Sequence, residues 1–359
     1  MRIRIVLDAV GGDNALAAPV HGAVLAARAY GCAVTLAGPQ AVIAAELARR
    51  TTRKLDITIV DAPTLIAMDA HATQAVRRNP HSAQAIGLRL VRDGAADAFV
   101  SAGHSGATMA AATLLLGRLD GVERPALATL FPAFERPILV LDIGATIDCT
   151  SAYLRQFAQM GHHYARHALG MGSPRIALLA NGEEQTKGDT LVQAAHGLLR
   201  ASTLHFVGNA EPKDALLGDM CDVLVCDGFV GNMFIKTAES IAKLVQTQAI
   251  AALKRHLAVR LLAGIAPTAL LAAMSGRGRR VATLAGAAFG GPALIGAATI
   301  PPLRWLRQRA DYRSYGGAPL LGLRGVAIIA HGRSDARAIM HALRQADLAA
   351  HGGITDMVV

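Results

Sequence analysis

The sequence has little cysteine and lacks several common catalytic motifs. Only four cysteines occur in 359 residues, and none has the spacing of a metal site. So few cysteines in a long chain indicate free thiols in a reducing compartment, without disulfides. No expected strand is followed by G-x-G-x-x-G, and the patterns G-x-x-x-x-G-K-[ST], H-E-x-x-H and G-x-S-x-G are absent. Nicotinamide cofactors, P-loop nucleotide hydrolysis, zinc proteolysis and serine-hydrolase chemistry therefore lose their usual sequence support.

Charge is missing from two long segments near the end of the chain. Residues 261–276 and 281–303 contain no charged side chain, and three arginines lie between them. The second segment exceeds the roughly 20 residues that a spanning helix needs, but glycines and prolines interrupt it. Apolar segments bracketed by arginines suit a helical hairpin in a membrane interface, with the cations on anionic head groups. A subunit interface or a buried helical pair is the alternative reading of this hairpin.

Acidic residues are outnumbered, and the imbalance is local. The chain has 36 lysines and arginines against 26 acids, a net charge of +10. Residues 254–313 alone hold ten of the basic residues against one acid, which leaves the remaining chain almost neutral. The charge therefore describes a basic patch rather than a general affinity for polyanions. The first eight residues have too short an apolar run for a signal peptide, so we expect a cytoplasmic protein.

Apolar runs alternate with segments of helical periodicity, and this alternation predicts an α/β fold with a mostly parallel sheet. The hydrophobic content of 52% is ample for one large core. We expect one discontinuous α/β domain over residues 1–253 and 311–349, with 254–310 as an inserted helical hairpin. The clearest predicted strands are 3–7, 33–37, 57–60, 98–100, 138–141, 175–179 and 223–226, and the clearest predicted helices are 19–29, 41–50, 82–92, 107–116, 151–169 and 188–200.

Six apolar runs end in polar turns that contain glycine. If all the strands are parallel, these turns open on the same edge of the sheet, where ligands of open α/β sheets bind. Helix amino termini at such an edge supply free N–H groups and a positive dipole end. The six turns begin at Asp8, Ser101, Asp142, Asn181, Asp227 and His331.

The turn between 181 and 188 is the most informative of the six. It holds two acids, an amide and a single lysine, Lys187, directly after a buried strand. With Asn232 at a neighbouring strand end, this composition suits a small oxyanion such as phosphate. Lys187 could hold phosphate by charge and then stabilise the oxygen that becomes negative when a carbonyl is attacked. The alternative is an ion pair of Lys187 with Glu183 or Glu184.

A histidine pair offers weaker evidence for a metal site. His163 and His167 lie four residues apart on one face of a predicted helix. No third ligand follows at a suitable spacing, so we interpret them as exposed or locally hydrogen-bonded and expect no metal.

Six glycine-bearing motifs follow one another along the chain. They are Asp8-Ala9-Val10-Gly11-Gly12-Asp13, Ser101-Ala102-Gly103-His104-Ser105-Gly106-Ala107, Gly182-Glu183-Glu184-Gln185-Thr186-Lys187-Gly188, Asp227-Gly228-Phe229-Val230-Gly231-Asn232, Tyr315-Gly316-Gly317-Ala318-Pro319-Leu320-Leu321-Gly322 and His331-Gly332-Arg333-Ser334-Asp335-Ala336. In this order they resemble the motifs of the bacterial phosphate acyltransferases of phospholipid synthesis (the PlsX family). The likeness covers nearly the whole chain except about 257–305.

This resemblance implies a reaction in which orthophosphate attacks a long-chain acyl thioester of acyl carrier protein and releases an acyl phosphate. It also implies a three-layer α/β/α fold like that of isocitrate and isopropylmalate dehydrogenases, a homodimer, and no metal or organic cofactor. The expected partners are acyl carrier protein, inorganic phosphate, a downstream glycerol-phosphate acyltransferase and the inner face of the membrane, contacted through 254–310. No nucleic acid is expected.

Carried over residue by residue, the resemblance makes Lys187 and Asn232 the catalytic residues. Lys187 would bind phosphate and the developing oxyanion, and Asn232 would orient one of them. The expected substrate- and phosphate-binding residues are Asp8, Gly11, Gly12, Asp13, Ser101, Gly103, His104, Ser105, Gly106, Asp142, Gly144, Glu183, Glu184, Asp227, Gly228, Gly231 and His331.

Three positions depart from the family pattern. His104 and Thr146 stand where asparagine is usual, and Ala180-Asn181 replaces an asparagine followed by an aliphatic residue. His104 could supply the hydrogen bond of the missing amide. Two other functions stay open: phosphotransacetylase-like transfer from acyl-coenzyme A, and an inactive membrane scaffold that has kept the fold.

Overall fold

The computed structural model describes residues 2–67, 72–274 and 316–357, with only the backbone described at 250, 253–254 and 256–274. The chain divides into two compact units, Met1–Met233 with Tyr312–Val359, and Phe234–Asp311. All described strands belong to the first unit: β1 (Arg4–Asp8), β2 (Ala33–Gly38), β3 (Ile57–Asp61), β4 (Ala98–Ser101), β5 (Ala126–Phe131), β6 (Ile138–Leu141), β7 (Ile176–Leu179), β8 (Phe206–Ala210), β9 (Val223–Val225), β10 (Ala318–Leu321) and β11 (Val326–Ile329).

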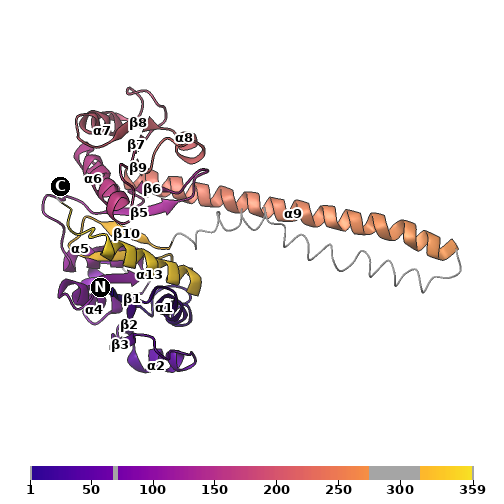
Figure 1. Cartoon of the computed structure of the whole chain (residues 1–359), viewed down its shortest axis with the longest axis horizontal. Coiled ribbons are helices and arrows are strands. Elements are labelled where there is room, and N and C mark those ends of the chain that lie inside the picture. The colour runs from indigo at the N-terminus through magenta and orange to yellow at the C-terminus, as the bar shows by residue number, and fades with distance from the viewer. Residues whose placement is uncertain (1, 68–71, 275–315, 358–359) are drawn as a thin grey trace. The chain divides into compact units, whose positions relative to one another are not determined.

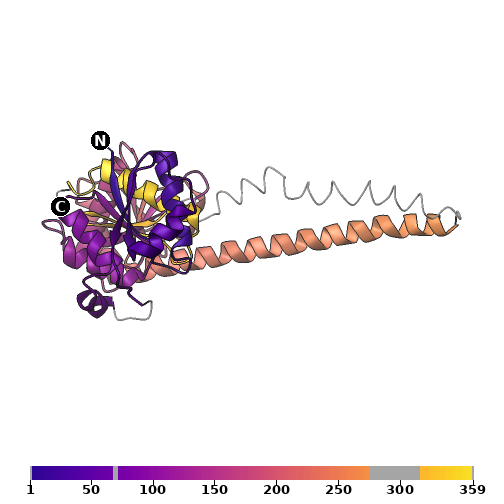
Figure 2. The same ribbon diagram turned by 90° about the horizontal axis from the view of Figure 1, so that it is seen from below.

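The described helices are α1 (Ala17–Tyr30), α2 (Gln40–Ala48), α3 (Ala72–Arg78), α4 (Ala83–Arg92), α5 (Ser105–Leu115), α6 (Ser151–His167), α7 (Thr190–Arg200), α8 (Pro212–Leu217), α9 (Gly228–Met274) and α13 (Ala336–His351). Helices of the first unit cover both faces of the sheet, whereas most of α9 belongs to the second unit (Figure 1). The sheet and its flanking helices form the three α/β/α layers that the sequence predicted, seen from another side in Figure 2.

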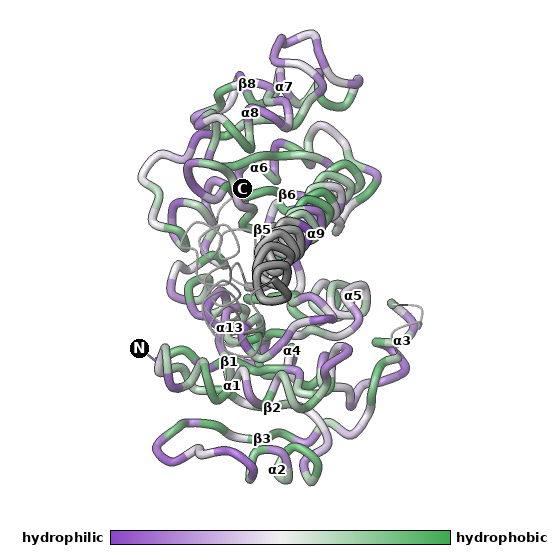
Figure 3. The backbone as a smooth tube through the Cα atoms, turned by 90° about the vertical axis from the view of Figure 1, so that its right-hand side faces the viewer, coloured by the Kyte–Doolittle hydropathy of each residue, from purple (hydrophilic) through white to green (hydrophobic). Residues whose placement is uncertain are grey.

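Two apolar cores lie on the two faces of this sheet because successive side chains of a strand point in opposite directions. In β1, Ile5 and Leu7 pack into the core beneath α1, α6, α7 and α13, whereas Val6 packs into the core beneath α3, α4 and α5. β4 divides in the same way, with Phe99 on the side of Val6. The strands are accordingly coloured mainly as hydrophobic in Figure 3.

The sheet has the strand order β3-β2-β1-β4-β11-β10-β5-β6-β9-β7-β8. Strands β1, β2, β3, β4 and β11 pair in parallel, and so do β6, β7, β8 and β9. Between the two sets lie three antiparallel pairings, β11 with β10, β10 with β5, and β5 with β6. An odd number of reversals means that the two parallel sets run in opposite directions.

The prediction that all six turns share one edge of the sheet is therefore wrong. The turns after β1, β4 and β11 open on one edge, and the turns after β6, β7 and β9 open on the other. The sequence prediction missed β5, β8 and β10. Of these, β5 and β10 lie at the centre of the sheet and carry no helical crossover to reveal their direction. Helix α3 was also missed, within a segment expected to be a loop.

Helix α9 begins at Gly228, within the turn predicted to begin at Asp227, so Asn232 lies in the second turn of this helix rather than in a loop. Of the predicted hairpin, 254–274 is the last part of α9, and 275–310 lies outside the described residues. Among the helices that the structure describes, none combines the length and hydropathy required to cross a bilayer.

Candidate active site

Lys187 lies in the loop that joins β7 to α7. Strand β7 is fully buried, and Asp189 begins α7 by accepting a hydrogen bond from the Val192 backbone N–H at 2.8 Å. The loop between them is exposed at Lys187. No acid forms an ion pair with Lys187 within the described ranges, so the alternative of a pair with Glu183 or Glu184 does not hold in this structure. The ammonium group is open to an anion.

The loop around Lys187 is held by side chains on both of its flanks. Asn181 accepts a hydrogen bond from the Gly188 N–H at 2.8 Å, which closes the loop across its base. Gln193 of α7 donates its amide to the carbonyl oxygens of Thr186 and Gly188 at 2.9 and 3.0 Å. These bonds fix the backbone on either side of Lys187, so little ordering of the loop is left to ligand binding.

The absence of a side chain at Gly182 leaves the space that the Lys187 side chain occupies. A Cβ atom at Gly182 would lie 2.6 Å from Lys187 Cγ and 3.1 Å from its Cδ, so the lysine stem lies directly on the glycine backbone. Because real Cβ atoms do not approach other carbons so closely, any side chain at 182 must displace the lysine. The glycine before the two acids is therefore part of the placement of the ammonium group.

Asn232 is placed by the loop that follows β6. The buried carboxylate of Asp142 accepts hydrogen bonds from the backbone N–H groups of Leu127, Gly144, Ala145 and Thr146, at 2.6 to 3.1 Å. Burial raises the pKa of Asp142, and these hydrogen bonds oppose that rise. A Cβ at Gly144 would lie 3.9 Å from Asn232, so the ordered loop lies beside the carboxamide.

Two glycines let helix α9 approach that loop. A Cβ at Gly231 would lie 2.0 Å from the carbonyl oxygen of Asp142, and one at Gly228 would lie 2.5 Å from that of Thr146. Only glycine fits such contacts with backbone atoms. Gly228 and Gly231 therefore bring the amino terminus of α9, and with it Asn232, against the Asp142 loop.

The amino terminus of α9 has no free N–H groups to offer. Gly228 N–H donates to Thr146 O, and Phe229 and Val230 N–H both donate to the Asp227 carboxylate. Gly231 N–H donates to the Asp227 carbonyl at 2.9 Å. The expectation of an open helix end here is therefore wrong, because Asp227 occupies the position that an anion would take. At this helix end, the polar groups left for a ligand are side chains.

A second group of predicted site residues gathers at the opposite edge, around Asp8. Asp8 is fully buried and accepts hydrogen bonds from Ser101 Oγ at 2.7 Å, Gln84 Nε2 at 3.1 Å and Val10 N–H at 3.1 Å. Burial raises the pKa of its carboxyl, while Ser101 and the backbone donors lower it. The carboxylate joins the turn after β1 to the turn after β4.

Glycines complete this second group. A Cβ at Gly11 would lie 2.6 Å from the Gly103 nitrogen, and one at Gly12 would lie 2.8 Å from the Gly332 carbonyl oxygen. Gly12 also has φ +87°, which favours glycine. Asp13 N–H donates to Gly332 O at 2.8 Å, so the turns after β1, β4 and β11 touch one another. Asp13 and His331 are exposed at the rim of this cluster.

His104 caps helix α5. Its Nδ1 accepts a hydrogen bond from the Ala107 N–H at 3.1 Å, which is the role of an asparagine oxygen at an N-cap. Nδ1 must be unprotonated for this, so the ring proton is on Nε2. An asparagine at this position could accept the same hydrogen bond through its side-chain oxygen.

Several residues of these two groups escaped the sequence analysis. Gln84, His196 and Asn209 are buried polar side chains within otherwise apolar segments, and one sequence carries no signal for the loops that they bond. A polar residue on the buried stripe of a predicted helix is the only sequence clue available for Gln84 and His196. His163 stacks on His167 with ring centroids 4.3 Å apart, and its Nε2 lies 3.3 Å from the carbonyl oxygen of Gly353, which is distant in the sequence rather than local.

The cysteines near these loops are not activated as nucleophiles. All four cysteines are free thiols, and Cys149 and Cys226 lie beside the Asp142 loop. Burial raises the pKa of Cys149 to about 11 and that of Cys226 well above its ordinary value. A thiol is a nucleophile only as the thiolate, so neither is activated at neutral pH.

Comparison with known proteins supports the fold first. The structure resembles a EutD phosphotransacetylase from Staphylococcus aureus with a TM-score of 0.56 at 16% identity, covering 97% of this chain and 94% of the other. A branched-chain phosphotransacylase from Enterococcus faecalis gives 0.54 at 11% identity, covering 97% and 99%. The fold thus defines a member of the α/β class that also contains these phosphotransacylases.

Sequence comparison defines the family. A family model described as fatty acid synthesis protein matches residues 3–275 and 268–357. The phosphate acyltransferase of Herpetosiphon aurantiacus is 52% identical over 345 residues, covering 96% of this chain and 93% of the relative. That of Myxococcus xanthus is 44% identical, covering 98% and 91%. The chain belongs to this phosphate acyltransferase family, as the resemblance predicted, and is an acyltransferase.

Proposed function

We propose that this enzyme transfers a long-chain fatty acyl group from the thioester of acyl carrier protein to inorganic phosphate. A phosphate oxygen attacks the carbonyl carbon, the C–S bond breaks, and the carrier leaves as a thiol after taking up a proton. The product is an acyl phosphate for phospholipid synthesis. The observation that supports this most directly is the exposed side chain of Lys187, which forms no ion pair with any residue that the structure describes and lies on a loop held by Asn181 and Gln193.

Lys187 would act in two ways. Its positive charge would bind phosphate, and it would then stabilise the negative oxygen that forms on the attacked carbonyl. The loop of Lys187 follows β7 and the helical turn of Asn232 follows β9, and because these strands are adjacent and parallel, both residues lie at the same edge of the sheet. Asn232, half-buried against the Asp142 loop, would orient the phosphate or the carbonyl with its carboxamide.

The other predicted site residues would contribute in different ways. Asp8 and Asp142 have their carboxylates occupied by internal donors, so we propose that they shape loops and do not touch phosphate. Asp227 would act similarly through its cap on α9. The remaining candidates stay predictions: Gly11, Gly12, Asp13, Ser101, Gly103, Ser105, Gly106, Gly144, Glu183, Glu184, Gly228, Gly231 and His331.

We further propose that the enzyme is a cytoplasmic homodimer that attaches to the inner face of the membrane through 254–310 and passes its product to a glycerol-phosphate acyltransferase. The basic, apolar composition of that segment supports membrane attachment. An acidic carrier protein would also be attracted to a basic surface.

A direct test incubates purified protein with labelled phosphate and either palmitoyl-acyl carrier protein or acetyl-coenzyme A. We expect labelled acyl phosphate and phosphate-dependent loss of thioester with the carrier substrate. Faster turnover of acetyl-coenzyme A would favour a phosphotransacetylase, the activity named for one protein of similar fold. No turnover of either thioester would favour the inactive scaffold. Lys187→Ala should abolish whichever activity is found, while Lys213→Ala, an exposed lysine paired with Glu211, should not.

A further inference from the structure

Two buried polar residues lie behind the Lys187 loop and are linked to it by hydrogen bonds. His196, on the inner face of α7, is 6% exposed, and Asn209, on β8, is 1% exposed. The Nδ1 atom of His196 lies 3.0 Å from Asn209 Oδ1, and Asn209 Nδ2 donates to the carbonyl oxygen of Glu184 at 3.0 Å. The backbone N–H of Lys187 donates to that same oxygen at 2.9 Å.

The donor and the acceptor of each of these hydrogen bonds can be assigned. Because Asn209 uses its amide N–H on Glu184, its oxygen faces the histidine and accepts. His196 must therefore carry a proton on Nδ1. The rings of His196 and Phe206 pack edge to face, with centroids 5.0 Å apart and planes at 79°, and this contact restricts rotation of His196. Histidine, asparagine and the Glu184 carbonyl thus form one oriented chain.

The Glu184 carbonyl is the point where this chain meets the loop. It accepts from Lys187 N–H and from Asn209, so one oxygen fixes the turn from Glu184 to Lys187 and ties it to β8. Asn181 and Gln193 hold the same loop from its exposed side, at Thr186 and Gly188. Among the bonds described for this loop, the Asn209 bond is the one anchored in the buried core.

We propose that His196 and Asn209 are positioning residues for Lys187: His196 orients the Asn209 carboxamide, and Asn209 fixes the loop that carries the ammonium group. This rests on the proposed role of Lys187 in holding phosphate. Neither side chain touches a substrate. Loss of the Asn209 bond releases the turn, and a displacement of about 1 Å at a reacting group can cost about a hundredfold in rate.

The variants separate the two bonds. Asn209→Asp keeps an acceptor for His196 but has no amide to donate to Glu184. His196→Leu removes the other bond, whereas His196→Asn can place an amide N–H where Nδ1 lies and should rescue it. His205→Asn is the matched control, since His205 is an exposed histidine directly before β8 and contacts Ser173 rather than the Lys187 loop. Circular dichroism melting identifies which variants remain folded.

Two readouts are measured on the full-length protein. The first is amide hydrogen exchange of 181–188, which we expect to speed up in Asn209→Asp and His196→Leu and to stay unchanged in His196→Asn and His205→Asn. The second is steady-state kinetics. We expect kcat/KM for inorganic phosphate to fall about tenfold to a hundredfold in the first two variants, with the KM for the acyl thioester changed less than about twofold.

The outcomes are distinguishable. Unchanged exchange and unchanged phosphate kinetics in folded Asn209→Asp would refute the positioning role. Equal loss in His196→Leu and His196→Asn would refute the hydrogen-bond direction. If wild-type protein shows no phosphate-dependent turnover, the proposed function fails, and the exchange of the loop alone then decides whether these two residues hold it. If Asn209→Asp does not fold, the comparison of the two His196 variants decides.

Discussion

At the scale of single residues, the contacts of Lys187 restrict the position of a side chain that is usually flexible. Lysine has several rotatable bonds, and an isolated exposed lysine would sample many positions. Here its stem lies on the bare backbone of Gly182, and its own N–H is bonded to Glu184 O. The absence of a paired acid among the described residues keeps the charge available for a ligand.

Gly182→Ala should therefore impair the enzyme without removing any functional group. The new methyl group would occupy the space of Lys187 Cγ, 2.6 Å from the ideal Cβ position, and turn the side chain away. We expect kcat/KM for phosphate to fall about tenfold or more. Phosphate-dependent thioester cleavage measures it. Gly197→Ala is the control, because a Cβ there meets nothing within 4 Å, and wild-type kinetics in Gly182→Ala would contradict the role of the glycine.

At the scale of elements, the helix caps depend on side chains that a motif search treats as functional. Asp227, Asp335 and His104 each accept N–H groups from the first turn of a helix. These bonds satisfy donors that would otherwise face water or a ligand. In a motif that resembles an anion site in the sequence, the helix N–H groups can therefore already be bonded to an acidic side chain of the motif itself.

The cap of α5 gives a test at this scale. His104→Asn should keep the cap, because asparagine offers an oxygen where Nδ1 now accepts, and His104→Ala should lose it. We expect His104→Ala to lower the free energy of unfolding by about 1 kcal/mol and His104→Asn to leave it nearly unchanged. Urea denaturation at neutral pH measures both. Equal destabilisation by the two substitutions would show that the histidine acts otherwise than as a cap.

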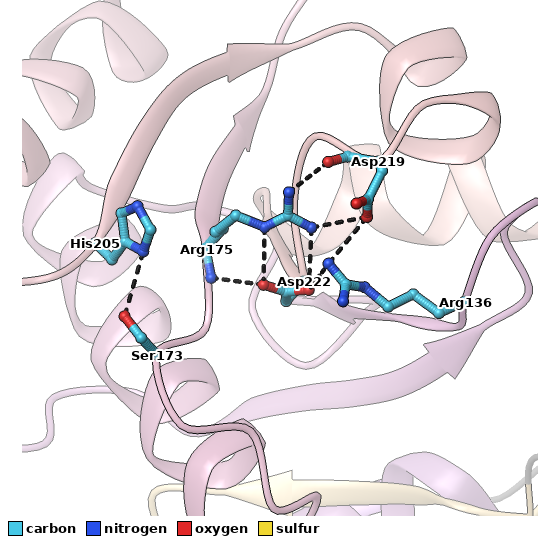
Figure 4. Close-up of polar contacts among 6 residues, drawn as sticks. All are labelled: Arg136, Ser173, Arg175, His205, Asp219 and Asp222. Atoms are coloured by element: carbon cyan, nitrogen blue, oxygen red, sulfur yellow. Dashed lines mark hydrogen bonds and ion pairs between the residues drawn. The ribbon is translucent and has the colours of Figure 1, made fainter.

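Strands β6, β7 and β9 are joined at their amino ends by an ion-pair network (Figure 4). Asp222 accepts from the Arg175 backbone N–H at 2.8 Å and from its guanidinium at 3.1 Å, and Arg136 lies 2.9 Å away. Burial alone would raise the pKa of Asp222, but the Arg175 hydrogen bonds outweigh it and lower the pKa. The charged carboxylate therefore stabilises the folded state.

Asp222→Asn should consequently destabilise the protein in a pH-dependent way. A lowered folded-state pKa means that the stabilisation is complete above the unfolded value of about 3.9 and is lost as the pH falls through the folded value. We expect a lower melting temperature than wild type at pH 7 and convergence of the two below about pH 4. Thermal melts across pH 3–7 measure this. Asp93→Asn, at an exposed pair with Arg92, should change little at any pH.

At the scale of the whole molecule, the sheet has two parallel halves that run in opposite directions around an antiparallel centre. The predicted site residues therefore fall into two groups. One surrounds Asp8, and the other contains Asp142 and Asn232, with the loop of Lys187 on the same edge. Both groups use the same device, a buried carboxylate that accepts N–H groups from glycine-bearing turns.

Burial throughout the first unit also predicts the behaviour of the thiols. Burial raises the pKa of Cys32 to about 11 and that of Cys221 to about 12, and Cys149 and Cys226 are raised likewise. We expect the native protein to react slowly with iodoacetamide at pH 7.5 and to keep its activity, because little thiolate is present. Mass spectrometry after labelling in native buffer and in urea measures this. Rapid inactivation by stoichiometric labelling would point to a cysteine in the reaction.

The sequence by itself determined the α/β class, the boundaries of most helices and strands, and the candidate residues Lys187 and Asn232. These follow from hydrophobic periodicity and from polar turns after apolar runs, which are local properties of the chain. Ordered motifs along nearly the whole length indicated the family before any fold was known.

Only the tertiary structure decided the direction of the two halves of the sheet, the occupied end of α9, and the contacts of His196 and Asn209 behind the Lys187 loop. Strand direction depends on pairing between segments far apart in the chain, and strands without a helical crossover, such as β5 and β10, carry no local sign of it. A buried polar residue likewise shows its purpose only through its partner. Periodicity records which side chains are buried, but not what they meet.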